Sequence, residues 1–356
     1  MVNQDAEAQA AAMPFIVALG AALTQAGTAV DEVEQTLLTV ADRLGLREAN
    51  VLVLPTAVML QTGDHATTSS RLTSFRRSWL RLDQINALDL MTRQAERGQV
   101  TPVEGLRRLA EIAAARPPLH WTVRVLGMGL LSVGFGMLLQ PSAAGLVLAF
   151  VLGLVVGALR VVDLPRLQAV LPVVATFGVS LVVFEAAVMY GLDNPLRMVI
   201  PPLVLFLPGA ALTTGTMELA SGETISGSSR LVEGIVHLLL LAFGILAASQ
   251  LVALPEATLI GSPITGLGWL VPLIGLLVIT LGHYLHNCAP LRSLGWILLV
   301  SCAAFAGQAA GAALVSPELS GFFGAVVMTP LILWLSRRPD GPPKMTLFLP
   351  AFWVLV

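Results

Sequence analysis

The spacing of apolar residues changes at about residue 120 of this chain. Before that point apolar positions alternate with polar and charged ones, and beyond it they form long, nearly unbroken runs. A run of about 20 apolar residues forms an α-helix that spans the roughly 30 Å hydrocarbon core of a bilayer. The pattern therefore predicts a water-exposed N-terminal segment followed by an all-α polytopic membrane domain.

The first 120 residues combine helical and strand-like periodicity, which predicts a small α+β domain. Thr28 and Gly45 have the residue types of a helix N-cap and a C-terminal stop. Thr101, Pro102 and Glu104 form a second helix start, with Pro at the first helical position. The expected helices are 15–23, 28–44, 84–97 and 102–115, and the expected strands are 51–55 and 57–60.

Nine apolar segments after residue 120 are long enough to be candidate membrane spans. The last of them is still apolar where the chain stops at Val356, so we expect a tenth span beyond it. The nine expected spans are about 122–139, 143–162, 168–190, 196–212, 231–254, 266–284, 291–314, 320–336 and 345–356.

Composition and charge exclude several classes of protein. The chain is 56% hydrophobic and 12% charged, and residues 1–120 hold 11 of its 20 basic and 13 of its 22 acidic side chains. The rest is too apolar for a water-soluble core, so it needs a lipid bilayer as its partner. A net charge of −2 gives no basic field for nucleic acid. Two cysteines, Cys288 and Cys302, are too few for a disulfide framework.

The cationic residues predict which way the spans run. If residues 1–120 lie in the cytoplasm and the spans alternate, the outer side receives Arg197 alone, which follows the positive-inside rule. The inner loops and span ends then receive the other eight basic residues, namely Arg124, Arg160, Arg166, Arg230, Arg292, Arg337, Arg338 and Lys344.

Glu185 is a carboxylate within the third expected span. A charge at bilayer depth costs about 2.5–3.5 kcal/mol on insertion scales, so it usually has a task. Glu185 is either a proton-coupling or substrate-binding carboxylate, or a structural side chain that pairs with a neighbouring helix or reaches the interface. The chain shows no Gly-x-Ser-x-Gly, no His-Glu-x-x-His and no paired aspartates in its spans. We therefore expect no enzyme activity, no metal site and no cofactor.

Proline and glycine predict a break in the fourth span, near its cytoplasmic end. Pro208 removes a backbone donor and Gly209 permits local unwinding. The freed backbone groups, together with the hydroxyls of Thr213 and Thr214, could meet a polar solute. The polar stretch continues to Arg230, and we prefer a re-entrant or cavity-lining segment over an exposed loop.

A weak internal repeat supports two inverted halves. The segment from Arg197 to Pro208 and the segment from Lys344 to Val356 each begin with a basic residue and Met, followed by an apolar run containing Pro. They lie five spans apart, so the two copies run in opposite directions, as in many secondary transporters. The expected organisation is an N-terminal domain over 1–120, a first five-span repeat over 121–260 and a second repeat over 261–356.

The chain resembles the bacterial threonine/serine exporter family. The N-terminal resemblance rests on Gly27, Glu34, the run Leu44-Gly45-Leu46 and Pro55. The more specific motif is Leu207-Pro-Gly, Leu212-Thr-Thr-Gly215, Glu218, Gly222, Ser226-Gly227 and Arg230. The closing segment Leu349–Val356 is also similar to the last span of the family, which normally continues with a Pro-Gly step.

The resemblance implies a multi-pass exporter of threonine and serine in the bacterial inner membrane, with ten spans and coupling to protons. Relatives with separately encoded halves export dicarboxylates such as succinate, so a dicarboxylate exporter is the alternative. A membrane-embedded enzyme with a hydrolase-like or regulatory N-terminal domain is the rival from another class. A homo-oligomer is left open. The expected proton-coupling residue is Glu185, and the expected substrate-binding residues are Pro208, Gly209, Thr213, Thr214, Gly215, Glu218 and Arg230.

Overall fold

The described residues form two compact units. A computed structural model describes residues 2–46, 48–63, 69–75, 80–139, 142–162, 165–192, 194–252, 268, 270–338 and 341–355. One unit contains 1–116 together with 210–234, and the other contains 117–209 and 235–356. The segment 210–234, which the sequence places in the membrane part, thus groups with the N-terminal residues. The expected repeat boundary at 260 lies outside the described residues, and the three-part division stays a prediction.

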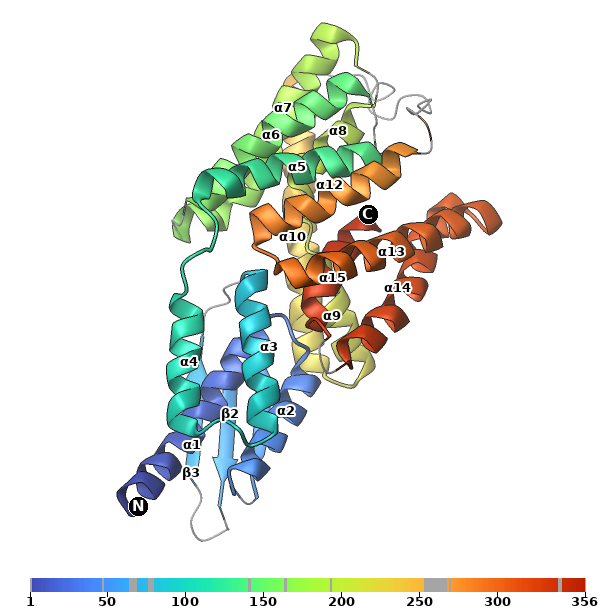
Figure 1. The fold of residues 1–356 in the computed structure, drawn as a ribbon. Coiled ribbons are helices and arrows are strands. Elements are labelled where there is room, and N and C mark those ends of the chain that lie inside the picture. The colour runs from blue at the N-terminus through green and yellow to red at the C-terminus, as the bar shows by residue number, and fades with distance from the viewer. Residues whose placement is uncertain are drawn as a thin grey trace. The chain divides into compact units, whose positions relative to one another are not determined.

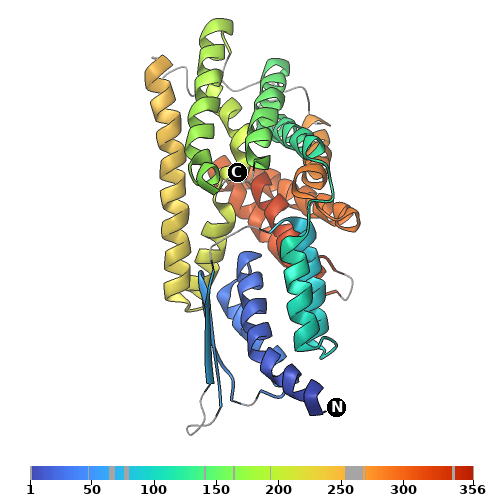
Figure 2. The ribbon, with the colours of Figure 1, turned by 90° about the vertical axis from the view of Figure 1, so that its left-hand side faces the viewer.

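The N-terminal part of the first unit contains four helices and one sheet. The strands form an antiparallel meander in the order β1-β2-β3, and Val53 of β1 pairs with Val58 of β2. Figure 2 shows this sheet edge-on, with the four helices on one side of it. The elements are α1 (Val2–Gln25), α2 (Val30–Arg43), β1 (Asn50–Leu54), β2 (Ala57–Thr62), β3 (Ser69–Ser74), α3 (Leu82–Glu96) and α4 (Pro102–Ala114).

The core of this part lies between the helices and one face of the sheet. Val58 and Leu60 alternate with exposed positions along β2 and are fully buried, as in a sheet with one covered face. Phe15 of α1 is buried against α4, where a Cβ at Gly105 would overlap its ring. Strand β3 was not expected, because its residues are almost all exposed and lack apolar alternation.

The two predicted helix starts have different outcomes. Helix α4 begins as expected, since the Thr101 hydroxyl accepts a hydrogen bond from the Glu104 amide. The prediction of Thr28 as the N-cap of α2 is wrong. The N-cap is Ala29, which offers no side-chain acceptor to the first amides of the helix. The hydrogen-bond acceptor that takes the place of the Thr28 hydroxyl comes from a distant part of the chain and belongs to the candidate site.

Seven helices are long and apolar enough to cross a membrane within the described residues, or up to eight if a bent pair counts as one span. The expected count of nine and the inverted repeats stay predictions. Helix α15 has 11 residues and is only about 17 Å long. The helices are α5 (Trp121–Leu139), α6 (Ala143–Val161), α7 (Pro165–Tyr190), α8 (Pro195–Leu203), α10 (Thr224–Val252), α12 (Leu270–Asn287), α13 (Leu294–Leu314), α14 (Ser320–Ser336) and α15 (Lys344–Val354), with 3₁₀ turns η1 (Val204–Phe206), η2 (Leu291–Ser293) and η3 (Pro317–Leu319).

Glycines bring α5 and α12 into close contact, and Figure 1 shows the two helices side by side. A Cβ at Gly127 would lie 2.5 Å from the His286 backbone nitrogen, and one at Gly134 would lie 2.8 Å from the Ile279 backbone nitrogen. On the other helix, a Cβ at Gly282 would lie 2.8 Å from the Leu131 nitrogen. Small residues at such positions let backbones approach, which is how membrane helices commonly associate.

The polar segment after Pro208 is helical rather than an exposed loop. Helix α9 (Gly209–Ala220) and α10 form a helical hairpin, and Gly222 in the turn has a φ of 95°, which favours glycine. The hairpin is tight, because a Cβ at Gly227 would lie 2.7 Å from the Gly215 carbonyl oxygen. Its two arms therefore hold the motif residues 215–230 in a fixed arrangement.

Candidate functional site

The predicted break in the fourth span is confirmed. Helix α8 with η1 and helix α9 are together long and apolar enough to form one span. The chain bends by 64° between them, from Phe206 to Gly209. Leu207 is extended, with φ −67° and ψ 125°, as expected for a residue that precedes proline. Pro208 itself has no backbone donor. The chain therefore changes direction at Leu207–Pro208.

Phe352 of α15 lies directly against this break. A Cβ at Gly209 would overlap the Phe352 ring, so glycine is the residue that lets the aromatic ring approach. Helix α15 continues through Pro350 without interruption, so the sequence repeat does not produce a second break there. The two segments that the sequence compares therefore meet, but only one of them is broken.

A cavity of about 200 Å³ lies close to the break and within the second unit. This volume is below the roughly 300–1,000 Å³ of pockets for drug-sized ligands, and it suits a small solute. Gln308 is its polar residue, and the Gln308 side-chain nitrogen is 3.4 Å from the Leu355 carbonyl oxygen. The cavity is lined by Phe135, Leu138, Leu139, Ile200, Val204, Phe305, Gln308, Trp353 and Val354.

A buried histidine lies behind one wall of the cavity. The His283 ring stacks on the Trp353 ring, with centroids 5.3 Å apart and planes 6° apart. His283 is fully buried, and its Nδ1 atom is 2.8 Å from the Asn287 side-chain nitrogen. Sequence reasoning did not identify Phe352, Trp353 or His283 as site residues, because nothing local marks them as neighbours of the break.

Two of the predicted substrate-binding residues form a buried ion pair. The Arg230 Nε atom lies 3.0 Å from Glu218 Oε2, and both side chains are at most 1% exposed. The Val30 amide donates a hydrogen bond to Glu218 Oε1 over 3.1 Å. Glu218 therefore caps the N-terminus of α2, in place of the expected Thr28, and its charge suits the positive end of the helix.

The remaining predicted residues of the motif lie along α9. Thr214 is 4% exposed and Thr213 is half-buried. A Cβ at Gly215 would lie 3.1 Å from the Arg230 Cβ, so Gly215 lets α10 approach. Pro208 and Gly209 belong to the second unit, and residues 210–234 belong to the first. The structure thus brings Gly215, Glu218 and Arg230 together.

Glu185 lies on the exposed face of α7, in the second unit. It is five residues from the helix end at Tyr190, or about 7–8 Å along the axis. Val182 and Val188, one turn on either side, are also exposed. Only a short path therefore leads from the Glu185 carboxylate to the end of the helix. This agrees with the interpretation of Glu185 as a side chain that reaches the interface.

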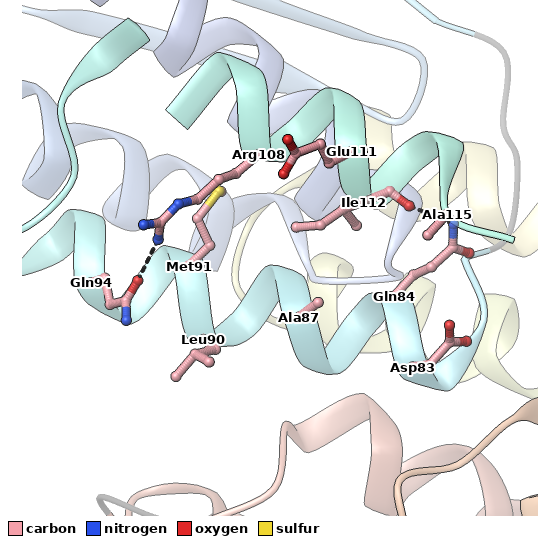
Figure 3. A pocket seen from close by; sticks show the side chains of 10 residues that line it. All are labelled: Asp83, Gln84, Ala87, Leu90, Met91, Gln94, Arg108, Glu111, Ile112 and Ala115. Carbon is pink, nitrogen blue, oxygen red and sulfur yellow. Dashed lines mark hydrogen bonds between the residues drawn. The ribbon is translucent and has the colours of Figure 1, made fainter. Parts of the chain in front are cut away.

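A second pocket, a groove of about 350 Å³, lies between α3 and α4 in the first unit (Figure 3). The Arg108 side chain donates a hydrogen bond to Gln94, and the Gln84 side chain donates one to the Ile112 carbonyl oxygen. Arg108 also pairs with Glu104, and hydrogen bonds from Arg107 and Arg108 lower the pKa of Glu104 to about 2. The groove is therefore bordered by groups that already bind one another.

Comparisons with known proteins identify the family. A search of curated proteins and a search of solved structures found no match. A family model described as "Putative threonine/serine exporter" matches residues 14–252, which is more than half of the chain. The match includes the N-terminal helices, the break at Pro208 and the hairpin of α9 and α10. The chain is a multi-pass membrane protein and belongs to the threonine/serine exporter family.

Proposed function

We propose that this protein exports threonine, serine or a related small hydroxy amino acid across the bacterial inner membrane, with its N-terminus in the cytoplasm. Membership in an exporter family supports membrane transport of a small polar solute. The observation that carries the proposal is the break at Leu207–Pro208 with a small cavity close by. A broken helix offers backbone groups to a solute while the rest of the span stays helical.

The start of α9 is the proposed contact for the hydroxyl oxygen of the amino acid. The first amides of a helix lack intrahelical acceptors and can donate hydrogen bonds to such an oxygen. Helix α9 begins at Gly209, immediately after the break, and Thr213 and Thr214 lie one turn further along. Their hydroxyls suit a substrate hydroxyl or ammonium group, since a hydroxyl both donates and accepts hydrogen bonds.

Glu218 and Arg230 are proposed to meet the substrate only if their ion pair opens. Each is buried against the other, and Glu218 also accepts the Val30 amide. Direct substrate contact by these two residues stays a prediction. Their pairing supports a further role in holding the hairpin of α9 and α10 to α2.

Glu185 is the proposed proton-coupling residue in an antiport with protons. Its carboxylate is on the outward face of α7 and near the end of that helix, where it can exchange protons with the interface. Protonation neutralises the side chain, and a neutral side chain crosses or rests in an apolar layer at lower cost than an ion. A glutamine at this position would keep the shape and remove the charge change.

The experiment is threonine efflux from cells that are loaded with a threonine-containing dipeptide. We expect Glu185→Gln to slow efflux driven by a proton gradient and Thr214→Val to lower efflux in all conditions. Matched controls are Glu318→Gln, in an exposed 3₁₀ turn, and Thr216→Val, on the exposed face of α9. Unchanged efflux in both Glu185→Gln and Thr214→Val would contradict these assignments. Export of succinate in place of threonine would support the dicarboxylate alternative.

A further inference from the structure

Two arginines come together at one end of the α5–α6 pair. Arg124 is in the first turn of α5 and Arg160 is in the last turn of α6. The helices are in close contact at this end, because a Cβ at Gly157 would lie 3.2 Å from the Val125 carbonyl oxygen. Arg160 follows Gly157 by one turn and Arg124 directly precedes Val125. Two like charges are therefore held on facing helices.

Neither arginine has an ion pair with a carboxylate in the described part of the chain. Within the described residues, the Arg124 Nε atom and the Arg160 Nη1 atom are enclosed by protein and have no hydrogen-bond partner. The imidazole ring of His286 of α12 lies nearby, and its Nδ1 atom is 2.9 Å from the Arg124 carbonyl oxygen. Buried cationic donors usually have a partner, and like charges in proximity repel. An anion would supply what this cluster lacks.

The Arg160 guanidinium also lies beside the break in the fourth span. Its central carbon is 5.4 Å from the centroid of the Phe206 ring, and Phe206 is the last residue of η1 before Leu207–Pro208. A guanidinium that stacks on a ring uses its face for that contact and keeps its edge for hydrogen bonds. Both arginines are half-buried.

We propose that Arg124 and Arg160 form a site for an oxyanion, and that the anion is the carboxylate of the exported solute. Paired N–H groups of a guanidinium match the two oxygens of a carboxylate, and a lysine in the same place offers only a point charge. A lipid phosphate has the same chemistry, but the contact of Arg160 with Phe206 places this cluster next to the break. The assignment to substrate rests on the proposed function; the anion site itself does not.

The test is equilibrium binding of radiolabelled threonine to the purified full chain in nanodiscs of zwitterionic lipid. The competitors are unlabelled threonine and threoninol, in which a CH₂OH group replaces the carboxylate. Wild type should prefer threonine to threoninol. We expect Arg160→Gln and Arg124→Gln to weaken threonine binding at least tenfold and to abolish that preference. Arg160→Lys should retain part of the affinity. Arg197→Gln, at an exposed arginine elsewhere in the same unit, should behave like wild type.

The outcomes separate this inference from the proposed function. If threonine is exported, and Arg160→Gln keeps both its affinity and its preference over threoninol, the anion site is wrong and the exporter assignment stands. If wild type binds no threonine but binds succinate or inorganic phosphate, and Arg160→Gln loses that binding while Arg160→Lys retains part of it, the anion site stands and the amino-acid assignment fails. A loss of bound anionic phosphatidylglycerol in native mass spectrometry, with threonine binding unchanged, would identify a lipid site and overturn the proposal. Size-exclusion profiles show that each variant is folded.

Discussion

Removing the Glu218 carboxylate should loosen the start of α2, although 188 positions separate it from Val30. Glu218→Ala removes the acceptor of the Val30 amide and leaves the Arg230 guanidinium without its carboxylate. Glu218→Gln keeps an oxygen that can accept the amide but removes the negative charge. The two variants therefore separate the hydrogen bond from the ion pair.

The expected magnitudes follow from the geometry. Two unit charges 3.0 Å apart attract by about 5–6 kcal/mol at an effective dielectric constant of 20. Desolvation of both groups offsets most of this attraction, so the intact pair adds little net stability. Breaking it from one side is different, and leaving a buried charge uncompensated costs about 3–5 kcal/mol. Loss of a helix cap costs about 0.5–2 kcal/mol.

Hydrogen exchange of the α2 amides, read by mass spectrometry on the full chain, measures the cap directly. A cost of about 1.4 kcal/mol corresponds to a tenfold faster exchange, so Glu218→Ala should speed exchange of the Val30 amide roughly tenfold. Glu218→Gln should retain most of the protection while still losing stability from the lone Arg230. Arg230→Met together with Glu218→Gln should recover stability, because both charges are gone. Unchanged exchange at Val30 in Glu218→Ala would refute the capping role.

Three further predictions concern the break, the cavity and one titrating residue. Gly209→Val should abolish threonine efflux, because the valine side chain would overlap the Phe352 ring, and adding Phe352→Ala to this variant should restore part of the efflux. Gly178→Val is the control, because a side chain at Gly178 meets open space. Val204→Trp should fill the cavity and lower efflux while the protein still purifies as a monodisperse species, whereas Val147→Trp, at an exposed position, should not. Burial raises the pKa of Glu34, although the hydrogen bond from the Val53 amide partly opposes this. The folded state therefore keeps the Glu34 carboxyl protonated up to a higher pH than the unfolded chain does. Stability from Glu34 is then present below its unfolded pKa of about 4.3 and is lost as pH rises through the folded pKa. Glu34→Gln should flatten that fall in thermal unfolding curves, and an unchanged pH dependence would count against it.

Local chemistry explains which helix boundaries could be predicted from the sequence. Thr101, Pro102 and Glu104 lie within one turn, and their cap forms as expected. The break at Pro208 is equally local, since a missing donor and the steric demand on Leu207 act on adjacent residues. In each of these cases the deciding interaction lies within a few positions along the chain.

Long-range contacts explain what the sequence could not predict. Thr28 has the residue type of an N-cap, yet the acceptor used is Glu218, which arrives only when the hairpin of α9 and α10 packs on α2. Strand β3 exists because it pairs with β2, and no apolar alternation marks it. Helix α15 runs through Pro350 even though the same residue type at Pro208 accompanies a break. Proline permits a break, and packing decides whether one occurs.

The charges of the apolar region have different tasks, and the structure separates them. Glu218 and Arg230, which the sequence predicts as substrate ligands, form an ion pair with each other, and Glu218 also caps α2. Arg124 and Arg160, which the sequence uses only to orient the spans, have enclosed donors that find no partner among the described residues, and Arg160 lies beside the break. A charge whose partner is within the chain holds the fold, while a cation without one can hold a ligand. Substrate recognition is therefore better sought at Arg160 than at Arg230, although Arg230 belongs to the more specific sequence motif.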